Sequence, residues 1–135
     1  MGVTIYSRNN EEKKVSMGYI RFGNVRMDIA NAYNYEIGSI YESHYKSFDS
    51  STRASLENRF DSILSIANRK TKLLMSFLNA SDCGASATRT ICKVIFELKD
   101  KVIEMNRKYE EYTKDYIIPF FDVVEDGCKK GIKWC

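Results

Sequence analysis

Apolar residues recur at helical spacing from residue 88 to residue 116, and this is the clearest pattern in the chain. Successive apolar positions alternate between steps of four and three residues, which places their side chains along one face of a helix. They are Ile91, Ile95, Leu98, Val102, Met105, Tyr109, Tyr112 and Tyr116. Acidic and basic residues fill the positions between them. The pattern predicts one long amphipathic helix over residues 88–116 that packs along its length against another helix.

A second helix with a similar repeat is predicted over residues 52–77. Its face is interrupted only by Lys70 and consists of Leu56, Phe60, Ile63, Ala67, Leu74 and Phe77. Because the two helices have similar lengths and matching apolar faces, we expect them to pack as an antiparallel hairpin joined by the loop 79–86. Thr88 is the expected N-cap of the second arm, since its hydroxyl can accept from a free backbone N–H group.

The N-terminal part predicts a β-ribbon followed by a first helix. Residues 3–6 and 15–19 are short β-prone runs with a polar stretch between them, a pattern typical of a β-hairpin. Such a ribbon is unstable alone and needs helices beneath it. The first helix is expected over residues 25–45, with Asn24 as its N-cap and a bend at Gly38.

The C-terminal part predicts a helix stop, a short helix and a final strand. Pro119 is expected to end the long helix and to lie in the first turn of a helix over residues 120–124. Gly127 is expected to close that helix in the left-handed conformation, and residues 131–135 are β-prone enough to lie beside the ribbon. The fold class is therefore α+β and mainly helical, in a single domain of residues 1–135.

Composition excludes several classes of protein. Of the 135 residues, 44% are hydrophobic and 13% aromatic, which supports a buried core. The net charge of +3 is too small for a protein that grips long nucleic acid. No segment resembles a secretory signal or is apolar for long enough to cross a bilayer, so a cytoplasmic location in a host cell is expected.

The four cysteines are Cys83, Cys92, Cys128 and Cys135. Their spacing fits no zinc finger or ribbon, and cysteines of cytoplasmic proteins are generally reduced. We therefore expect four free thiols and no structural metal. The alternative is that the four converge on a metal ion, because the first two flank one turn and the last two flank another.

No catalytic apparatus or cofactor motif is visible in the sequence. The single histidine, His44, is expected on the surface at the end of the first helix. There is no nucleophile motif and no glycine-rich phosphate loop. The paired acids Glu11-Glu12 and Glu110-Glu111 are adjacent, so on a helix they would face apart. The chain is not expected to be an enzyme or to hold a cofactor.

The strongest candidate for ligand binding is the segment 19–26. It combines aromatic, cationic and amide side chains at an expected helix N-terminus, namely Tyr19, Arg21, Phe22, Asn24 and Arg26. Helix N-termini favour anions, aromatic rings can stack on a base, and arginines can hold phosphate. On this interpretation Arg26→Ala weakens binding and leaves the fold intact. The alternative is that the rings pack the ribbon on the helices while the arginines pair with acids.

A second basic cluster is formed by Arg69, Lys70 and Lys72, near the expected end of the second helix. Arg89 and Lys93 would lie close to it at the start of the next helix, across the tip of the predicted hairpin. Such a basic rim suits a small anion or an acidic protein partner. The alternative is that these charges only complement the helix dipole.

Three stretches resemble small accessory proteins encoded by phages and prophages of Gram-positive bacteria. They are residues 17–26 followed by Ile29-Ala30, residues 74–92, and residues 127–134. The central loop of those proteins usually reads Asp-Cys-Asp-Gly, whereas this chain has Asp82-Cys83-Gly84-Ala85, which argues against a metal site there. The resemblance implies a phage accessory protein, and such proteins are often antagonists of bacterial defence.

Two functional hypotheses follow. The first is a non-catalytic protein that binds and sequesters a nucleotide-type immune signal through the ligand-binding residues named above. The second is a protein inhibitor that docks on a host defence protein such as a nuclease, through its helical faces or a ribbon edge. Neither involves a membrane. In both cases a homo-oligomer is expected, because the tyrosines that end the long helix leave apolar surface to be covered.

Overall fold

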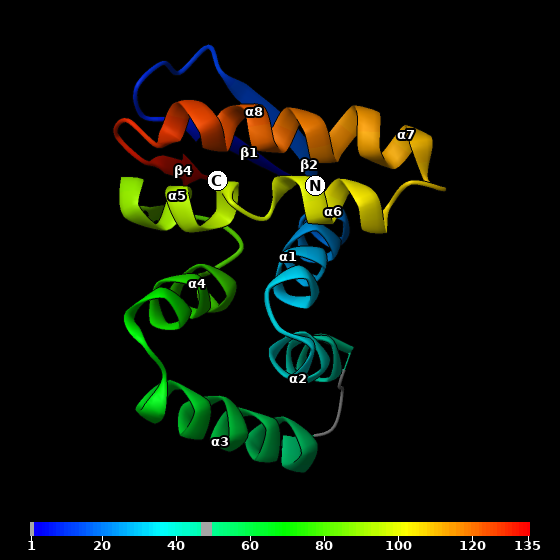
Figure 1. Ribbon diagram of the computed structural model, residues 1–135, viewed down its shortest axis with the longest axis vertical. Coiled ribbons are helices and arrows are strands. Elements are labelled where there is room, and N and C mark those ends of the chain that lie inside the picture. Colours follow the sequence, from blue (N-terminus) through cyan, green and yellow to red (C-terminus); the bar gives the residue numbers. More distant parts are fainter. Residues whose placement is uncertain (1, 47–49) are drawn as a thin grey trace.

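The structure is a computed structural model that describes residues 2–46 and 50–135. Helices make up most of the chain and pack against a four-stranded antiparallel sheet with the order β2-β1-β4-β3 (Figure 1). The strands are β1 (Gly2–Ser7), β2 (Lys14–Gly18), β3 (Ala85–Ala87) and β4 (Ile132–Trp134). The predicted α+β, mainly helical class is confirmed.

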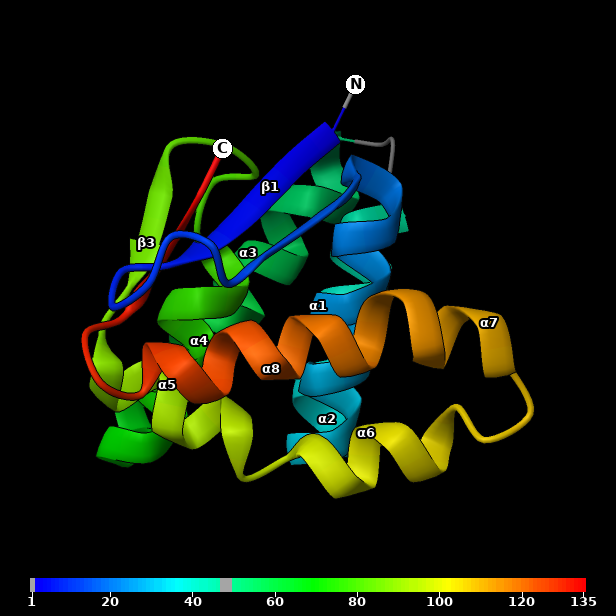
Figure 2. The ribbon, with the colours of Figure 1, turned by 90° about the horizontal axis from the view of Figure 1, so that it is seen from above.

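The helices follow the chain in three groups. The first group is α1 (Tyr19–Tyr33), α2 (Tyr35–Lys46), α3 (Ser50–Ile66) and α4 (Arg69–Asn79). The second is α5 (Arg89–Phe96) and α6 (Lys99–Met105). The third is α7 (Glu110–Tyr112), the π-helical turn η1 (Thr113–Ile117) and α8 (Ile118–Gly127), which Figure 2 shows as one continuous ribbon running beside the second group.

The sheet confirms the predicted N-terminal hairpin and the predicted C-terminal strand. Strand β1 pairs with β2 in the register Ile5↔Val15 and with β4 in the register Ile5↔Trp134. Alternate side chains of β1 are buried, which is the pattern of a strand with one face against a core. That face packs on α8, which also contacts α5.

The predicted helix over residues 88–116 is wrong in its length. Its start and its N-cap are confirmed, because Thr88 Oγ1 accepts a hydrogen bond from Ile91 N at 3.3 Å. The helix breaks already after Phe96, where α5 ends, and α6 begins at Lys99. Helix α6 then ends where Asn106 is buried and its side chain donates to Val102 O at 2.9 Å. An asparagine bonded to its own preceding turn competes with the helical pattern. Beyond this point Tyr109 is 53% exposed, so a position in the apolar repeat is no longer a buried position.

Pro119 does not interrupt the helical ribbon between Glu110 and Gly127. The wider turn η1 comes directly before it, and such a turn accommodates the missing N–H group and the bulk of the proline ring. An antiparallel helical hairpin is therefore present, but its arms are residues 89–105 and 110–127 rather than 52–77 and 88–116. Gly127 does not have a positive φ; the positive φ in this part of the chain is at Gly131, 96°, after the turn that follows α8.

Asparagine caps divide the other two predicted helices. The helix expected over residues 25–45 begins earlier, at Tyr19, and breaks at Asn34, whose Oδ1 accepts from the backbone N–H groups of Glu36 and Ile37. The helix expected over residues 52–77 breaks before Asn68, which caps α4 through Thr71 N. Asn24 therefore lies inside α1 and is not an N-cap.

The bend expected at Gly38 is also absent, because α2 continues through this residue. Glycine is needed here for a different reason. A Cβ atom at Gly38 would overlap the side chain of Asn31, so the missing side chain lets α1 and α2 approach closely.

The expectation of four free thiols is wrong for two of the cysteines. Cys83 and Cys135 form a disulfide, with their Cα atoms 4.1 Å apart, whereas Cys92 and Cys128 are free. The pairing of β3 with β4 places Ala85 opposite Trp134 and so brings the flanking cysteines together. Within residues 2–46 and 50–135, no group of three or more potential metal ligands is placed to hold an ion.

Ser7 joins the ribbon to the end of α8. Its buried hydroxyl donates to Asp126 Oδ2, and this bond is the main reason that the pKa of Asp126 lies below its usual value.

We expect Ser7→Ala to lower the free energy of unfolding by about 1–2 kcal/mol at neutral pH. A carboxyl group with a lowered folded-state pKa stabilises the fold above its unfolded-state pKa, and this contribution is lost as the pH falls through the lowered value. Urea denaturation at neutral and at acidic pH measures the difference in unfolding free energy between the unmodified protein and Ser7→Ala. This difference should be smaller in acid, and an equal difference at the two pH values would contradict the role of the Asp126 charge.

None of the helices among the described residues is both long enough and apolar enough to cross a bilayer. Aromatic side chains from three helices and one strand meet instead in a buried core. Phe22 of α1, Phe77 of α4, Phe120 of α8 and Trp134 of β4 are all buried, and the rings of Phe22 and Trp134 lie 5.7 Å apart in an edge-to-face arrangement. This core decides which residues of the segment 19–26 can reach a ligand.

Candidate functional site

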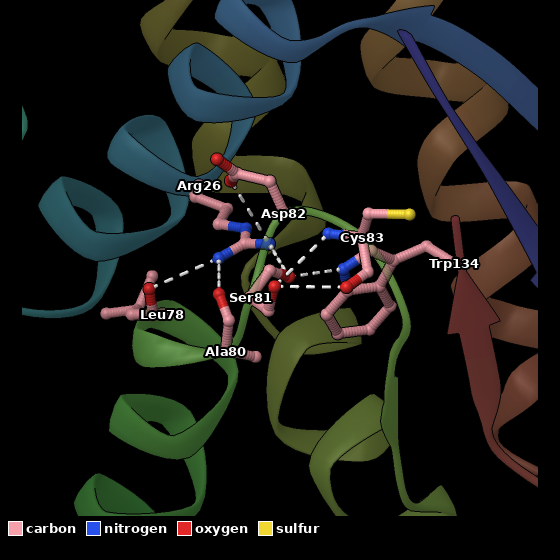
Figure 3. A network of polar contacts seen from close by, with 7 residues as sticks. All are labelled: Arg26, Leu78, Ala80, Ser81, Asp82, Cys83 and Trp134. Atoms are coloured by element: carbon pink, nitrogen blue, oxygen red, sulfur yellow. Dashed lines mark hydrogen bonds and ion pairs between the residues drawn. The ribbon is translucent and has the colours of Figure 1, made fainter.

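Arg26 is buried against the aromatic core and bonded to the protein backbone (Figure 3). Its Nη1 donates to the carbonyl oxygens of Leu78 and Ala80 at 3.3 and 2.6 Å, and its Nη2 donates to Ser81 O at 3.1 Å. The guanidinium also lies 4.2 Å from the centre of the Phe22 ring. These contacts attach α1 to the chain that follows α4, which is a structural role.

The loop held by Arg26 is fixed from its other side as well. Trp134 Nε1 donates to Ser81 O at 2.8 Å, and the carboxylate of Asp82 lies 3.8 Å from the Arg26 guanidinium. Because Phe22 is fully buried in the same cluster, neither Phe22 nor Arg26 presents its side chain to solvent. Tyr19 is half-buried against the core. The predicted patch is therefore divided between the interior and the surface.

Arg21 lies on the exposed side of α1, and its guanidinium contacts the rings of two tyrosines. Its guanidinium carbon is 4.6 Å from the ring centre of Tyr116 and 5.3 Å from that of Tyr112. Among the residues that the structure describes, no acceptor forms a hydrogen bond or an ion pair with this guanidinium. A contact between a cation and aromatic rings restrains the guanidinium while leaving its N–H donors available.

Arg21 borders two adjoining hollows, which we call the inner and the outer hollow and together the groove. The inner hollow, of about 260 Å³, is lined by Arg21, Asn24, Met27, Asp28, Asn106, Tyr109 and Tyr112. The outer hollow, of about 540 Å³, shares three of these residues and is completed by Lys108, Glu110, Glu111, Asp115 and Tyr116. Together they approach the size of pockets that hold a small ligand.

A polar cluster forms one wall of the inner hollow. Asp28 Oδ2 accepts hydrogen bonds from Tyr112 OH at 2.9 Å and from Asn106 Nδ2 at 3.2 Å. Burial raises the pKa of Asp28, an effect that these two bonds partly offset. Burial and the neighbouring Asp28 charge raise the pKa of Tyr112 well above its usual value, so the tyrosine keeps its proton and remains a donor. The cluster therefore holds the carboxyl group of Asp28 in one orientation.

Arg89 and Lys93 lie on exposed surface of α5, and the predicted basic rim is not assembled around them. Lys70 is at the start of α4 and forms an ion pair with Glu97, beyond the opposite end of α5 from Arg89. Figure 2 places α5 and α7 at opposite ends of the helical layer, so Arg89 and Lys93 are also remote from the groove. The sequence pattern could not show this distance, because it predicted one continuous helix where the structure has two antiparallel helical arms.

The sequence analysis found Arg21 and Asn24 but missed the rest of the groove. It assigned Tyr109, Tyr112 and Tyr116 to a packed helix face and gave Asp28 no role. One signal was available: Arg21, Asn24 and Asp28 are spaced three and four residues apart and so share a face of α1. The turn before α7, which brings the tyrosines to that face, could not be predicted from the apolar pattern.

The groove is lined mainly by polar and charged side chains. Its described lining holds an arginine, amides, carboxylates and tyrosines, and contains no cysteine, serine or histidine. The side chain of His44, expected on the surface, falls outside the described side chains. Comparisons with models of protein families, with curated proteins and with solved structures find no match.

Proposed function

We propose that the chain is a non-catalytic binding protein that sequesters a nucleotide-type ligand in the groove. The observation that carries the proposal is Arg21, an arginine placed over the rings of Tyr112 and Tyr116 without an acceptor among the described residues. In a phage-encoded protein, as the resemblance implies, the ligand would be a nucleotide immune signal of the host. The protein would then act as an antagonist of bacterial defence.

The phosphate and the base of a nucleotide each have a matching group in the groove. Arg21 can hold a phosphate through two parallel charge-assisted hydrogen bonds. Tyr109, with 53% of its surface exposed, offers a ring face on which a base can stack. The sequence analysis expected Tyr19 or Phe22 against the base and the pair Arg21 and Arg26 at the phosphate. In the proposal Tyr109 replaces the first two, and Arg21 acts alone.

The charge of the groove limits the ligands that it can hold. Two cationic side chains, Arg21 and Lys108, line it together with four acidic ones. The acidic residues are Asp28, Glu110, Glu111 and Asp115. One phosphate can be placed at Arg21, but each further negative charge meets more carboxylates than cations. The groove therefore favours a nucleotide with few charges.

We expect a nucleoside monophosphate to bind at least about tenfold more tightly than the triphosphate of the same base at low salt, because like charges repel most strongly there. Calorimetric titration in magnesium-free buffer measures both dissociation constants. The ratio should shrink as salt is added, since the acidic residues are near the surface. Tighter binding of the triphosphate would contradict the assignment of the phosphate to this groove.

Co-purification tests the function without prior choice of a ligand. The tagged protein is recovered from host lysate and denatured, and mass spectrometry identifies the small molecules and proteins that are released. Arg21→Ala, purified in parallel, is the control. The proposal expects an intact nucleotide from the unmodified protein and little from the variant. A chemically altered nucleotide would indicate an enzyme instead.

A second candidate is a protein inhibitor that docks on a host defence protein such as a nuclease. It is favoured by apolar surface on the other side of the same helical hairpin, where a hollow of about 380 Å³ is bordered by Ile103 and Ile118. Met105 is 39% exposed and Ile118 is 37% exposed. Such surface commonly marks a protein interface, and the homo-oligomer that we propose would use it too. A protein recovered at fixed stoichiometry, without a nucleotide, would favour this candidate.

A further inference from the structure

We infer that the inner hollow selects a nucleobase that carries an exocyclic amino group, which donates a hydrogen bond to Asp28 Oδ1. The inference rests on the proposed function and names the class of base that the groove takes. It follows from the orientation of the Asp28 carboxylate, from the amide beside it, and from the walls of the hollow.

The carboxylate of Asp28 has one oxygen engaged and one available. Its Oδ2 accepts from both Tyr112 OH and Asn106 Nδ2. Asn106 is buried and also donates to Val102 O, so the cluster is anchored to the backbone of α6. Within the described part of the chain, Oδ1 has no hydrogen-bond partner. A fixed acceptor without a donor therefore belongs to a residue that lines the hollow, and we infer that it faces the ligand.

Asn24 supplies the complementary group. It precedes Asp28 by one helical turn on the same face of α1, and its amide forms no hydrogen bond with other described residues. An ionised carboxylate only accepts hydrogen bonds, whereas an amide both donates and accepts. A base edge with an amino group beside a ring nitrogen or carbonyl matches this pair. A base edge with an acceptor opposite Asp28 would place two acceptors face to face.

The walls of the inner hollow suit the flat faces of a base. Met27 lies on the side of α1 and Tyr109 on the side of α7. Thioether and aromatic groups both pack well against a planar ring. Arg21 lies at the junction with the outer hollow, so a phosphate held there leaves the base directed toward Asp28.

The test compares adenosine monophosphate with purine riboside monophosphate, which lacks the amino group and has no N–H donor on its base. We expect the second compound to bind about tenfold more weakly or worse, as is typical when a charged acceptor loses its donor. Guanosine and cytidine monophosphates show which amino group fits best. Equal binding of the adenosine and purine compounds would overturn the inference and leave the proposed function standing. If none of these monophosphates binds, the inference fails, and the proposed function fails with it when cyclic dinucleotides and ADP-ribose derivatives do not bind either.

Asp28→Asn provides a second measurement. Its side-chain oxygen can still accept from Tyr112 and Asn106, so the NH₂ group would face the hollow in place of an acceptor. We expect the preference for the amino-bearing base to disappear, with the purine compound binding at least as tightly as the adenosine compound. Asp122→Asn, which removes the same charge from exposed surface of α8, should keep the preference. Unchanged selectivity in folded Asp28→Asn, checked by thermal unfolding, would contradict the role of Asp28.

Discussion

Arg26→Met is expected to lower the free energy of unfolding by about 3–5 kcal/mol, the largest effect that we predict. Methionine keeps most of the volume beside Phe22 but provides no donors. The carbonyl oxygens of Leu78, Ala80 and Ser81 would then lose the hydrogen bonds that they accept from Arg26. Leu78 O is buried, so water cannot readily replace its missing donor, whereas Ser81 O keeps the hydrogen bond from Trp134 Nε1.

Urea denaturation measures this effect, with Arg107→Met as the matched control. Arg107 is an exposed arginine whose ion pair is with Glu104 one turn before it, and its side chain is 80% exposed. We expect the control to change stability by less than about 0.5 kcal/mol. A similarly small loss in Arg26→Met would show that the guanidinium does not hold the loop after α4. From the sequence we expected Arg26 to bind the ligand, so that its substitution would weaken binding. Because Arg26 is buried, its substitution is now expected to destabilise the fold.

Arg21→Ala is expected to weaken nucleotide binding by about 10- to 100-fold, because it removes the charge-assisted bonds to phosphate. The fold should lose only about 0.5–1 kcal/mol, the value of an exposed contact between a cation and an aromatic ring. Arg21→Lys keeps the charge but not the planar fork, so we expect an intermediate affinity. Calorimetry with a nucleoside monophosphate gives the three dissociation constants.

Arg89→Ala is the control for this series. It removes an arginine from exposed surface of α5, at the far end of the helical layer from the groove. Its affinity should equal that of the unmodified protein. If Arg89→Ala weakens binding and Arg21→Ala does not, the ligand lies elsewhere and the sequence-based choice of Arg89 and Lys93 gains support.

Local sequence signals predicted the parts of the fold that depend on near neighbours. The ribbon, the final strand and the Thr88 cap are each encoded within a few residues. The helix breaks at Asn34, Asn68 and Asn106, and the one between Phe96 and Lys99, were missed because the apolar residues on the two sides of each break keep helical spacing. An asparagine that caps a new helix changes the direction of the chain without disturbing that repeat.

The candidate site could be predicted only in part, because its members are distant in sequence. The contacts of Arg26 lie 52 to 55 residues along the chain and are backbone carbonyls, which leave no trace in side-chain pattern. Asp28 meets its partners Asn106 and Tyr112 across 78 and 84 residues. The disulfide likewise joins cysteines 52 residues apart through the pairing of two short strands. Such contacts follow from topology and not from local spacing.

The central claim is that the groove binds a nucleotide and releases it unchanged, and calorimetric titration tests it most directly. Adenosine, guanosine, cytidine and uridine monophosphates, cyclic dinucleotides and ADP-ribose derivatives form the panel. The account predicts saturable binding of at least one member with one ligand per chain, recovery of that ligand intact by mass spectrometry, and loss of affinity in Arg21→Ala. Absence of saturable binding across the panel, or equal affinity in Arg21→Ala, would contradict it.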